Sequence, residues 1–184
     1  MPPTESTRRV FLIGFMGAGK TTVGQALARR LGWAFVDLDE RIEHRRQKTV
    51  AAIFAEEGEA AFRRAESAVL QELLEPDNSG YGKGLVVALG GGAFVQPDNR
   101  SAIEKAGAAS VLLEAPLEEL RRRCDNDPKP RPLAKDQQVF AQLFAQRHGA
   151  YELARFRADT MGKSVEEVAA EIQRMIAATV KLEV

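Results

Sequence analysis

The sequence predicts an α/β fold of three layers, in which a central parallel sheet is covered by helices on both faces. Two observations predict it. Short apolar runs that are typical of fully buried strands alternate with segments of helical spacing. A glycine-rich turn joins the first of these runs directly to a helical segment. With 184 residues, of which 45% are hydrophobic, we expect one domain spanning residues 1–184.

The glycine-rich turn reads GFMGAGKTT at residues 14–22 and fits the P-loop pattern G-x-x-x-x-G-K-[ST]. Backbone N–H groups of such a loop and the positive end of the following helix bind phosphate. Lys20 is expected to reach the β- and γ-phosphates, and the Thr21 hydroxyl to bind Mg²⁺. The sequence therefore predicts the P-loop NTPase fold and an ATP site. The residues expected to bind the nucleotide are Gly17, Ala18, Gly19, Lys20, Thr21 and Thr22.

The first half of the chain contains two predicted strands and three predicted helices. Residues 10–13 form an apolar strand, and residues 20–31 form a helix in which Val23, Leu27 and Leu31 share one face. Gly32 ends this helix. The other predicted elements are a strand at 33–39, a short charged helix at 41–48 and a helix at 50–74 with a break near Gly58.

Glycine, proline and polar clusters divide the second half. The expected strands are 85–89 and 109–113. The expected helices are 97–106, 116–123 and 136–154, followed by a last helix that begins at the capping box 164–167. Residues 76–84 are predicted to be a turn-rich loop, and residues 125–135, with three prolines, a mobile one.

Polar groups follow two of the predicted strands. Asp37 and Asp39 are two residues apart, so they would point to the same side if the strand stays regular. Three glycines, Gly90, Gly91 and Gly92, follow the strand at 85–89. Ligands of such folds bind at the carboxyl ends of the strands. One aspartate could hold metal-bound water while the other faces an acceptor; alternatively, both are solvated acids.

A P-loop alone leaves open a GTPase, an ATP-driven motor and a small-molecule kinase. The chain has no Asn-Lys-x-Asp motif to specify guanine, and it is short for the coupling domains of a motor. A kinase needs a carboxylate near the γ-phosphate and donors that hold the acceptor. The acidic strand end and the later arginines supply such groups.

Composition limits the partners and the compartment. Acidic and basic residues balance at 26 each, so no global field favours nucleic acid or membrane. The run at Arg121 lacks the interleaved aromatic residues of a nucleic-acid site. No apolar run approaches the roughly 20 residues of a membrane span, and no signal-peptide core is expected. Cys124 is the single cysteine, which favours the reducing cytoplasm. We expect a cytoplasmic monomer.

Five further segments extend the pattern, and with them the chain resembles the shikimate kinase family. Besides GFMGAGKTT, the similar motifs are DLDERIE at 37–43, GEAAFRRAE at 58–66, ALGGGAF at 88–94 and RPL at 131–133. Arg147 also lies four residues before Tyr151, as in that family. The matches extend from residue 10 to about residue 155, and their order and spacing together are highly specific.

The resemblance implies a nucleoside-monophosphate-kinase-like fold and transfer of the γ-phosphate of ATP to the 3-hydroxyl of shikimate, with Mg²⁺. It implies that Asp39 orients the acceptor hydroxyl and acts as the base, and that Asp37 binds Mg²⁺ through water. It also implies a lid at 125–135, whose Arg131 closes over the phosphates, and a substrate-binding helical region at about 40–75. The residues implied to hold shikimate are Asp39, Arg63, Gly90, Gly91, Gly92 and Arg147.

Side-chain chemistry is consistent with these roles. Guanidinium groups pair bidentately with a carboxylate, and successive glycines let the backbone approach a polar ligand closely. Glu66, three residues after Arg63, can hold its guanidinium. Which arginine covers adenine is left open, with Arg123 as the candidate, because the loop is about one residue longer than the family pattern. The other adenine wall is expected from the loop at 159–164, where Lys163 is the candidate. A gluconate kinase-like enzyme and a non-catalytic nucleotide-dependent binding protein are the alternative functions.

Overall fold

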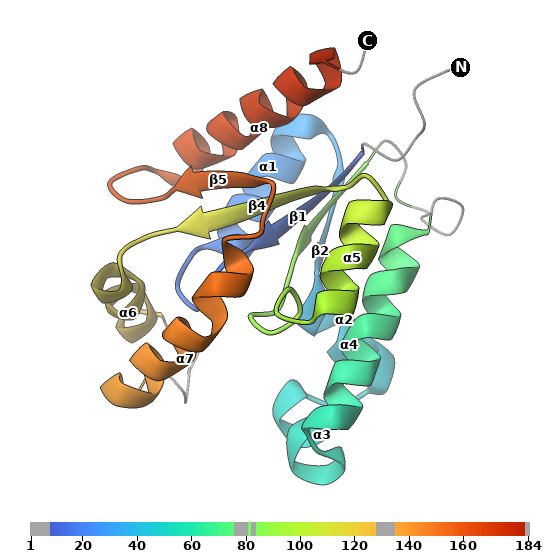
Figure 1. The fold of residues 1–184 in the computed structure, drawn as a ribbon, viewed down its shortest axis with the longest axis vertical. Coiled ribbons are helices and arrows are strands. Elements are labelled where there is room, and N and C mark those ends of the chain that lie inside the picture. Colours follow the sequence, from blue (N-terminus) through green and yellow to red (C-terminus); the bar gives the residue numbers. More distant parts are fainter. Residues whose placement is uncertain (1–7, 76–80, 82–83, 128–134, 183–184) are drawn as a thin grey trace.

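Five parallel strands form one sheet in the order β2-β3-β1-β4-β5 (Figure 1). The computed structural model describes residues 8–75, 81, 84–127 and 135–182. All side chains of the central strand β1 are buried, as expected for a strand that is paired on both sides and covered on both faces. The strands are β1 (Arg9–Ile13), β2 (Ala34–Asp37), β3 (Leu85–Ala88), β4 (Ala109–Glu114) and β5 (Phe156–Asp159).

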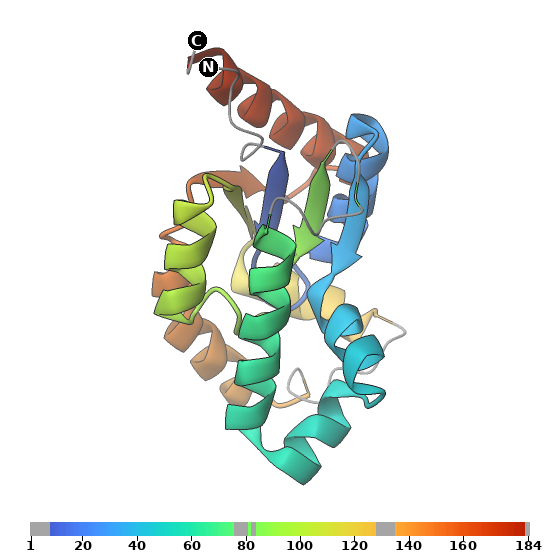
Figure 2. The same ribbon diagram turned by 90° about the vertical axis from the view of Figure 1, so that its right-hand side faces the viewer.

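Helices lie on both faces of the sheet, which confirms the predicted three layers. On one face α1 (Lys20–Leu31) packs against α8 (Val165–Leu182); on the other, α4 (Glu59–Leu74) packs against α5 (Pro97–Lys105) (Figure 2). The remaining helices are α2 (Leu38–Arg46), α3 (Val50–Glu57), α6 (Leu117–Asp125) and α7 (Gln137–Tyr151). None of the helices in the described part of the chain is long and apolar enough to cross a membrane.

Most predicted elements are present with small changes at their ends. Val23 and Leu27 are buried on α1, and Gly32 ends this helix with φ 65°. The predicted break near Gly58 is also present, since Gly58 has φ 82° between α3 and α4. Ser164 forms the predicted capping box with Glu167, whose carboxylate accepts from the Ser164 backbone N–H at 2.7 Å.

Two assignments differ from the structure. The second strand does not extend to residue 39: β2 ends at Asp37, and α2 begins at Leu38. A fifth strand, Phe156–Asp159, was not predicted. It pairs with β4 at the edge of the sheet, and of its four residues only Ala158 is fully buried. A four-residue edge strand has too little apolar periodicity to be recognised locally.

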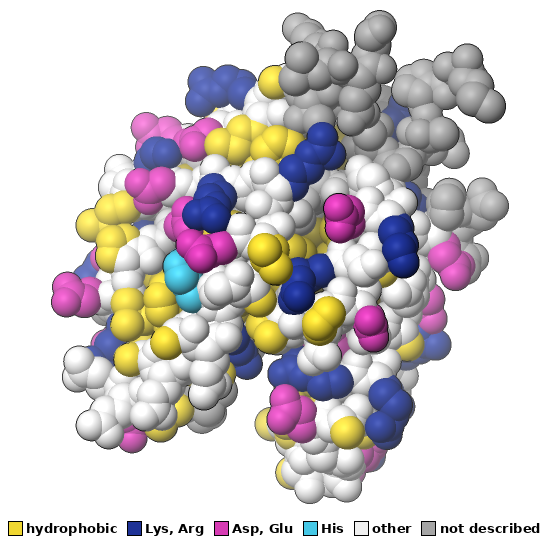
Figure 3. All heavy atoms as spheres, viewed as in Figure 1, with side chains coloured by type: hydrophobic (Ala, Val, Ile, Leu, Met, Phe, Trp, Pro, Cys, Tyr) yellow, Lys and Arg dark blue, Asp and Glu magenta, His cyan; other side chains and the backbone are white. Residues whose placement is uncertain are grey.

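The strands end toward the region where α3, α6 and α7 lie, and the molecular surface is hollowed between α7 and the end formed by α3 and α4 (Figure 3). Lys and Arg side chains are visible at the inner end of this hollow. Residues 76–80, 82–83 and 128–134 of the two predicted loops lie outside the described residues.

Candidate active site

The loop between β1 and α1 has the geometry of a phosphate-binding turn. Gly17 has φ 80° and Gly19 φ 90°, conformations that favour glycine. Gly19 is the N-cap of α1, and no side chain caps the helix. Because the N-cap is a glycine without a side chain, the N–H groups of the first turn and the helix dipole suit an anion.

Lys20 lies over this loop. Its ammonium donates to the carbonyl oxygen of Gly14 at 2.7 Å and to that of Phe15 at 3.2 Å. Thr22, in the same turn of α1, is exposed and donates from its hydroxyl to the Gly19 carbonyl. Two of the predicted nucleotide-binding side chains thus start from the first turn of α1 and are tied to the loop.

Thr21 and Asp37, the two residues predicted to hold Mg²⁺, contact each other. The Thr21 hydroxyl donates to Asp37 Oδ2 at 2.9 Å, which joins the start of α1 to the end of β2. A hydroxyl and a carboxylate are hard oxygen donors that suit Mg²⁺, which usually takes its remaining ligands from water and phosphate. Among the described residues, no group of three or more His, Cys, Asp and Glu could hold a metal ion by itself.

Asp37 and Asp39 do not lie on one strand, so the expectation that strand geometry turns them to the same side is wrong. Asp37 is the N-cap of α2, and its Oδ1 accepts from the backbone N–H groups of Asp39 at 3.1 Å and Glu40 at 3.4 Å. An aspartate at this position starts a helix. Asp39 therefore reaches the site from the first turn of α2.

The three glycines after β3 lie directly against the predicted acceptor-binding side chains. A β-carbon on Gly90 would lie 2.5 Å from Asp39 Oδ1, and one on Gly91 would lie 2.7 Å from Arg147 Nη1. A β-carbon on Gly92 would clash with the guanidinium of Arg63. None of these three glycines has positive φ, so close approach explains them rather than backbone strain.

The space that these glycines leave is occupied by the protein's own side chains. The sequence predicted close approach of a ligand to the backbone, whereas the structure shows close approach of Asp39, Arg63 and Arg147. These side chains come from α2, α4 and α7, which are far apart along the chain. The glycine run therefore brings together one carboxylate and two guanidinium groups at the carboxyl end of the sheet.

Glu66 holds Arg63 as predicted. Arg63 Nη1 donates to Glu66 Oε2 at 2.9 Å, and the neighbouring Phe62 is buried in the core. Glu66 is fully buried, and burial raises the pKa of its carboxyl group to about 7 although Arg63 opposes the shift. Buried groups with strongly shifted pKa values cluster at functional sites, which makes Glu66 part of the candidate site.

Asp39 is also perturbed. Burial is the main cause that raises the pKa of its carboxyl group, and the charge of Asp37 adds to it, while Lys20 and Arg63 act in the opposite direction. Asp39 Oδ1 and Glu66 Oε1 are buried with no hydrogen-bond partner among the described residues. Unsatisfied buried oxygens are rare in proteins, so these two atoms suit a ligand that donates hydrogen bonds.

Tyr151 was not predicted to be a functional residue, yet its hydroxyl donates to the Gly91 carbonyl oxygen. It lies one helical turn after Arg147 on α7. The spacing of four residues could have shown that the two share a helix face, but not which loop they contact.

The structure describes the residues predicted to lie at adenine, but only part of the predicted lid. Arg123 donates to Glu119, to both oxygens of Thr160 and, at 3.4 Å, to the Gly17 carbonyl of the phosphate loop. Lys163 instead pairs with Glu171 on α8 at 2.7 Å. Arg131 lies outside the described residues, so its role stays a prediction.

The raised pKa of Glu66 predicts a pH-dependent stability. Between pH 4.5 and about 7, folded Glu66 keeps a proton that the unfolded chain has lost. Its favourable contribution to the free energy of unfolding is therefore complete below pH 4.5 and is lost as pH rises through 7. In urea titrations, wild type should lose up to about 3 kcal/mol relative to Glu66→Gln between pH 4.5 and 8.

The exposed Glu104→Gln on α5 controls for the loss of one carboxylate. A difference between wild type and Glu66→Gln that stays constant over this pH range would contradict the assignment.

One solved structure shares the fold of this chain at low sequence identity. A solved gluconokinase from Sinorhizobium meliloti 1021 superposes with a TM-score of 0.64 at 17% identity, covering 94% of this chain and 93% of its own. At that identity the match shows the fold alone. It gives no support for gluconate as the acceptor.

Three matches of higher sequence similarity point to one family. The family model described as Shikimate kinase matches residues 16–177. A shikimate kinase from Geobacter sulfurreducens is 43% identical over 172 residues, covering 92% of this chain and 91% of the relative. A solved shikimate kinase from Acinetobacter baumannii, in complex with shikimate, has a TM-score of 0.82 and 36% identity, covering 95% and 96% of the two chains. The chain belongs to the shikimate kinase family.

Proposed function

We propose that this chain transfers the γ-phosphate of ATP to the 3-hydroxyl of shikimate, giving shikimate 3-phosphate on the route to chorismate and the aromatic amino acids. The observation that carries the proposal is the convergence of Asp39, Arg63 and Arg147 on the glycine run beside the phosphate loop. Family membership supports both the activity and the use of ATP with Mg²⁺.

The donor side consists of the phosphate loop and the metal pair. Backbone N–H groups at Gly17, Ala18 and Gly19 hold the phosphates, and Lys20 leaves the loop carbonyls to contact them. Thr21 would hold Mg²⁺ directly and Asp37 would hold it through water, and the ion would supply charge neutralisation at the phosphate oxygens.

The acceptor side recognises a carboxylate and a hydroxyl. Arg63 and Arg147 bind the carboxylate of shikimate, because guanidinium groups match its two oxygens. Asp39 accepts the hydrogen bond of the 3-hydroxyl, and its buried Oδ1 is available for that proton. As the hydroxyl oxygen bonds to the γ-phosphorus, the bond to the β-phosphate oxygen breaks, Asp39 receives the proton and ADP leaves. The raised pKa of Asp39 favours that step.

Closure completes the proposed site. Residues 125–135 act as the lid, whose closure excludes water and so limits ATP hydrolysis. Arg131 contacts the phosphates, where it stabilises the charge of the transition state. Residues 40–75 form the substrate-binding helical region. Arg123, next to Gly17, is the proposed neighbour of adenine. We further propose that the chain acts as a cytoplasmic monomer that binds neither nucleic acid nor membrane.

The acceptor is tested by a coupled assay of ADP release with shikimate, with gluconate and with no acceptor. Shikimate should accelerate ADP release far above the blank, while gluconate should not. Turnover with gluconate alone would favour the gluconate kinase alternative, and ATP binding without any turnover would favour a nucleotide-dependent binding protein.

The role of Asp39 predicts a loss of transfer without a loss of ATP binding. Asp39→Asn should lower kcat by about 10²- to 10⁴-fold, the range for removal of a general base. Calorimetric titration with a non-hydrolysable ATP analogue should give nearly the wild-type Kd. The neighbouring exposed Glu40→Gln is the control. An equal loss of nucleotide affinity in Asp39→Asn would place this residue on the donor side instead.

Gly90→Ala tests the close approach to Asp39. The added methyl group would lie 2.5 Å from Asp39 Oδ1 and should displace the carboxylate. Because a displacement of about 1 Å can reduce catalysis by about 10²-fold, we expect a loss of kcat of that order. Gly149→Ala on α7, where nothing lies within 4 Å of the added carbon, should keep wild-type kinetics. Similar kcat values for the two variants would show that the approach is not required.

A further inference from the structure

Tyr151 is the last residue of α7 and is 2% exposed, with its hydroxyl at the glycine run. The hydroxyl donates to the carbonyl oxygen of Gly91, which lies 60 residues earlier in the chain. Neither nucleotide binding nor the proton transfer described above uses this group. Its hydrogen bond to Gly91 nonetheless joins α7 to the run of glycines.

The Tyr151 hydroxyl and Arg147 meet at the same peptide. A β-carbon on Gly91 would lie 2.7 Å from Arg147 Nη1 and 3.5 Å from the Tyr151 hydroxyl. Burial and the charge of Glu66 raise the pKa of that hydroxyl, whereas the Arg147 guanidinium beside it and the charge of Arg63 lower it. Burial raises the pKa of Tyr151 to about 12, so the phenol stays protonated and remains a donor near neutral pH.

The hydroxyl therefore fixes two parts of the carboxylate subsite at once. Its oxygen lies beside the Arg147 guanidinium at Gly91 and offers that group an acceptor that orients it. By donating to the Gly91 carbonyl it fixes a planar peptide unit, in which the N–H of Gly92 points to the opposite side. The Arg147 guanidinium lies at Gly91 and that of Arg63 at Gly92, so Tyr151 influences the place where the carboxylate of the acceptor would bind.

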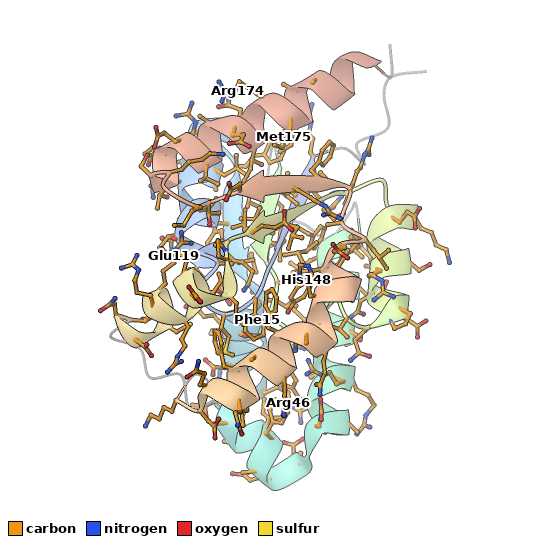
Figure 4. All side chains as sticks on the ribbon, turned by 60° about the vertical axis from the view of Figure 1, so that its left-hand side comes forward. Phe15, Arg46, Glu119, His148, Arg174 and Met175 are labelled. Atoms are coloured by element: carbon orange, nitrogen blue, oxygen red, sulfur yellow. The ribbon has the colours of Figure 1, made fainter. Side chains whose placement is uncertain are left out.

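The rest of α7 is anchored independently of Tyr151. Phe15 of the phosphate loop makes edge-to-face ring contacts with Phe140 at 4.9 Å and Phe144 at 5.4 Å between centroids. Figure 4 shows Phe15 lying beside α7, with His148 farther along the helix, and His148 stacks on Phe144. Loss of the Tyr151 hydroxyl should leave this packing, and hence the helix, in place.

We infer that Tyr151 is a positioning residue that holds Arg147 and the Gly91 peptide in the arrangement that binds the carboxylate of the acceptor. This inference rests on the proposed function, since it assigns the carboxylate of shikimate to that subsite. If Tyr151 positions the groups that bind the carboxylate, the effect of its loss depends on the charge of the acceptor. A purely structural role would affect charged and uncharged acceptors alike.

Tyr151→Phe, which removes one oxygen and keeps the ring, tests the inference. The KM for shikimate should rise about 5- to 20-fold, which lies between the typical effects of losing a neutral and a charge-assisted hydrogen bond. The kcat and the KM for ATP should stay within about twofold of wild type. The methyl ester of shikimate lacks the negative carboxylate, so its KM should change much less than that of shikimate.

Three outcomes would overturn the inference: an unchanged KM for shikimate, equal rises for shikimate and its methyl ester, or an equal rise for ATP. A Tyr151→Phe protein that does not fold would also overturn it, because the hydroxyl would then serve the fold. Tyr81→Phe controls for the loss of a phenolic hydroxyl elsewhere. Failure of wild type itself to phosphorylate shikimate would instead disprove the proposed function.

A double-mutant cycle with Arg147→Lys tests the route of the effect. If Tyr151 acts through Arg147, the double variant should raise the KM for shikimate clearly less than the product of the two single effects. Fully multiplicative effects would contradict action through Arg147.

Discussion

The close approach of three side chains to the backbone of Gly90–Gly92 is the constraint on which the acceptor side of this protein depends. Asp39, Arg63 and Arg147 come from three different helices, and each occupies space that a β-carbon would fill. Since these glycines have ordinary backbone angles, the chain uses them for their size alone. Their place directly after β3, next to the central strand β1, sets them beside the phosphate loop. The sheet thus determines the distance between donor and acceptor groups, and the helices supply the chemistry.

Bringing these groups together concentrates charge in a poorly solvated place. Burial raises the pKa of both Asp39 and Glu66, and the guanidinium of Arg63 partly compensates each of them. A ligand that carries one carboxylate and several hydroxyl groups would complete this arrangement, because its carboxylate pairs with the arginines and its hydroxyl with the unsatisfied Asp39 oxygen. The same burial that reduces stability near neutral pH therefore prepares the site for its substrate.

The sequence predicted the parts of the fold and site that local patterns determine. The phosphate loop, α1, the break at Gly58 and the Arg63–Glu66 pair each follow from the spacing of nearby residues. The edge strand β5 was missed because its stability comes from pairing with β4, which no local pattern records. Asp39 was misplaced on a strand, although Asp37 followed by Glu40 has the spacing of a helix start. The contact between Tyr151 and Gly91 joins residues 60 positions apart and required the folded chain.

The orientation of the acceptor is tested most directly by a crystal structure of this chain with shikimate and ADP. The account predicts the carboxylate of shikimate within hydrogen-bond distance of both Arg63 and Arg147. It also predicts the 3-hydroxyl on Asp39, turned toward Lys20 and the phosphates. A complex in which the carboxylate lies away from these arginines, or in which a different part of the ring faces Asp39, would contradict it.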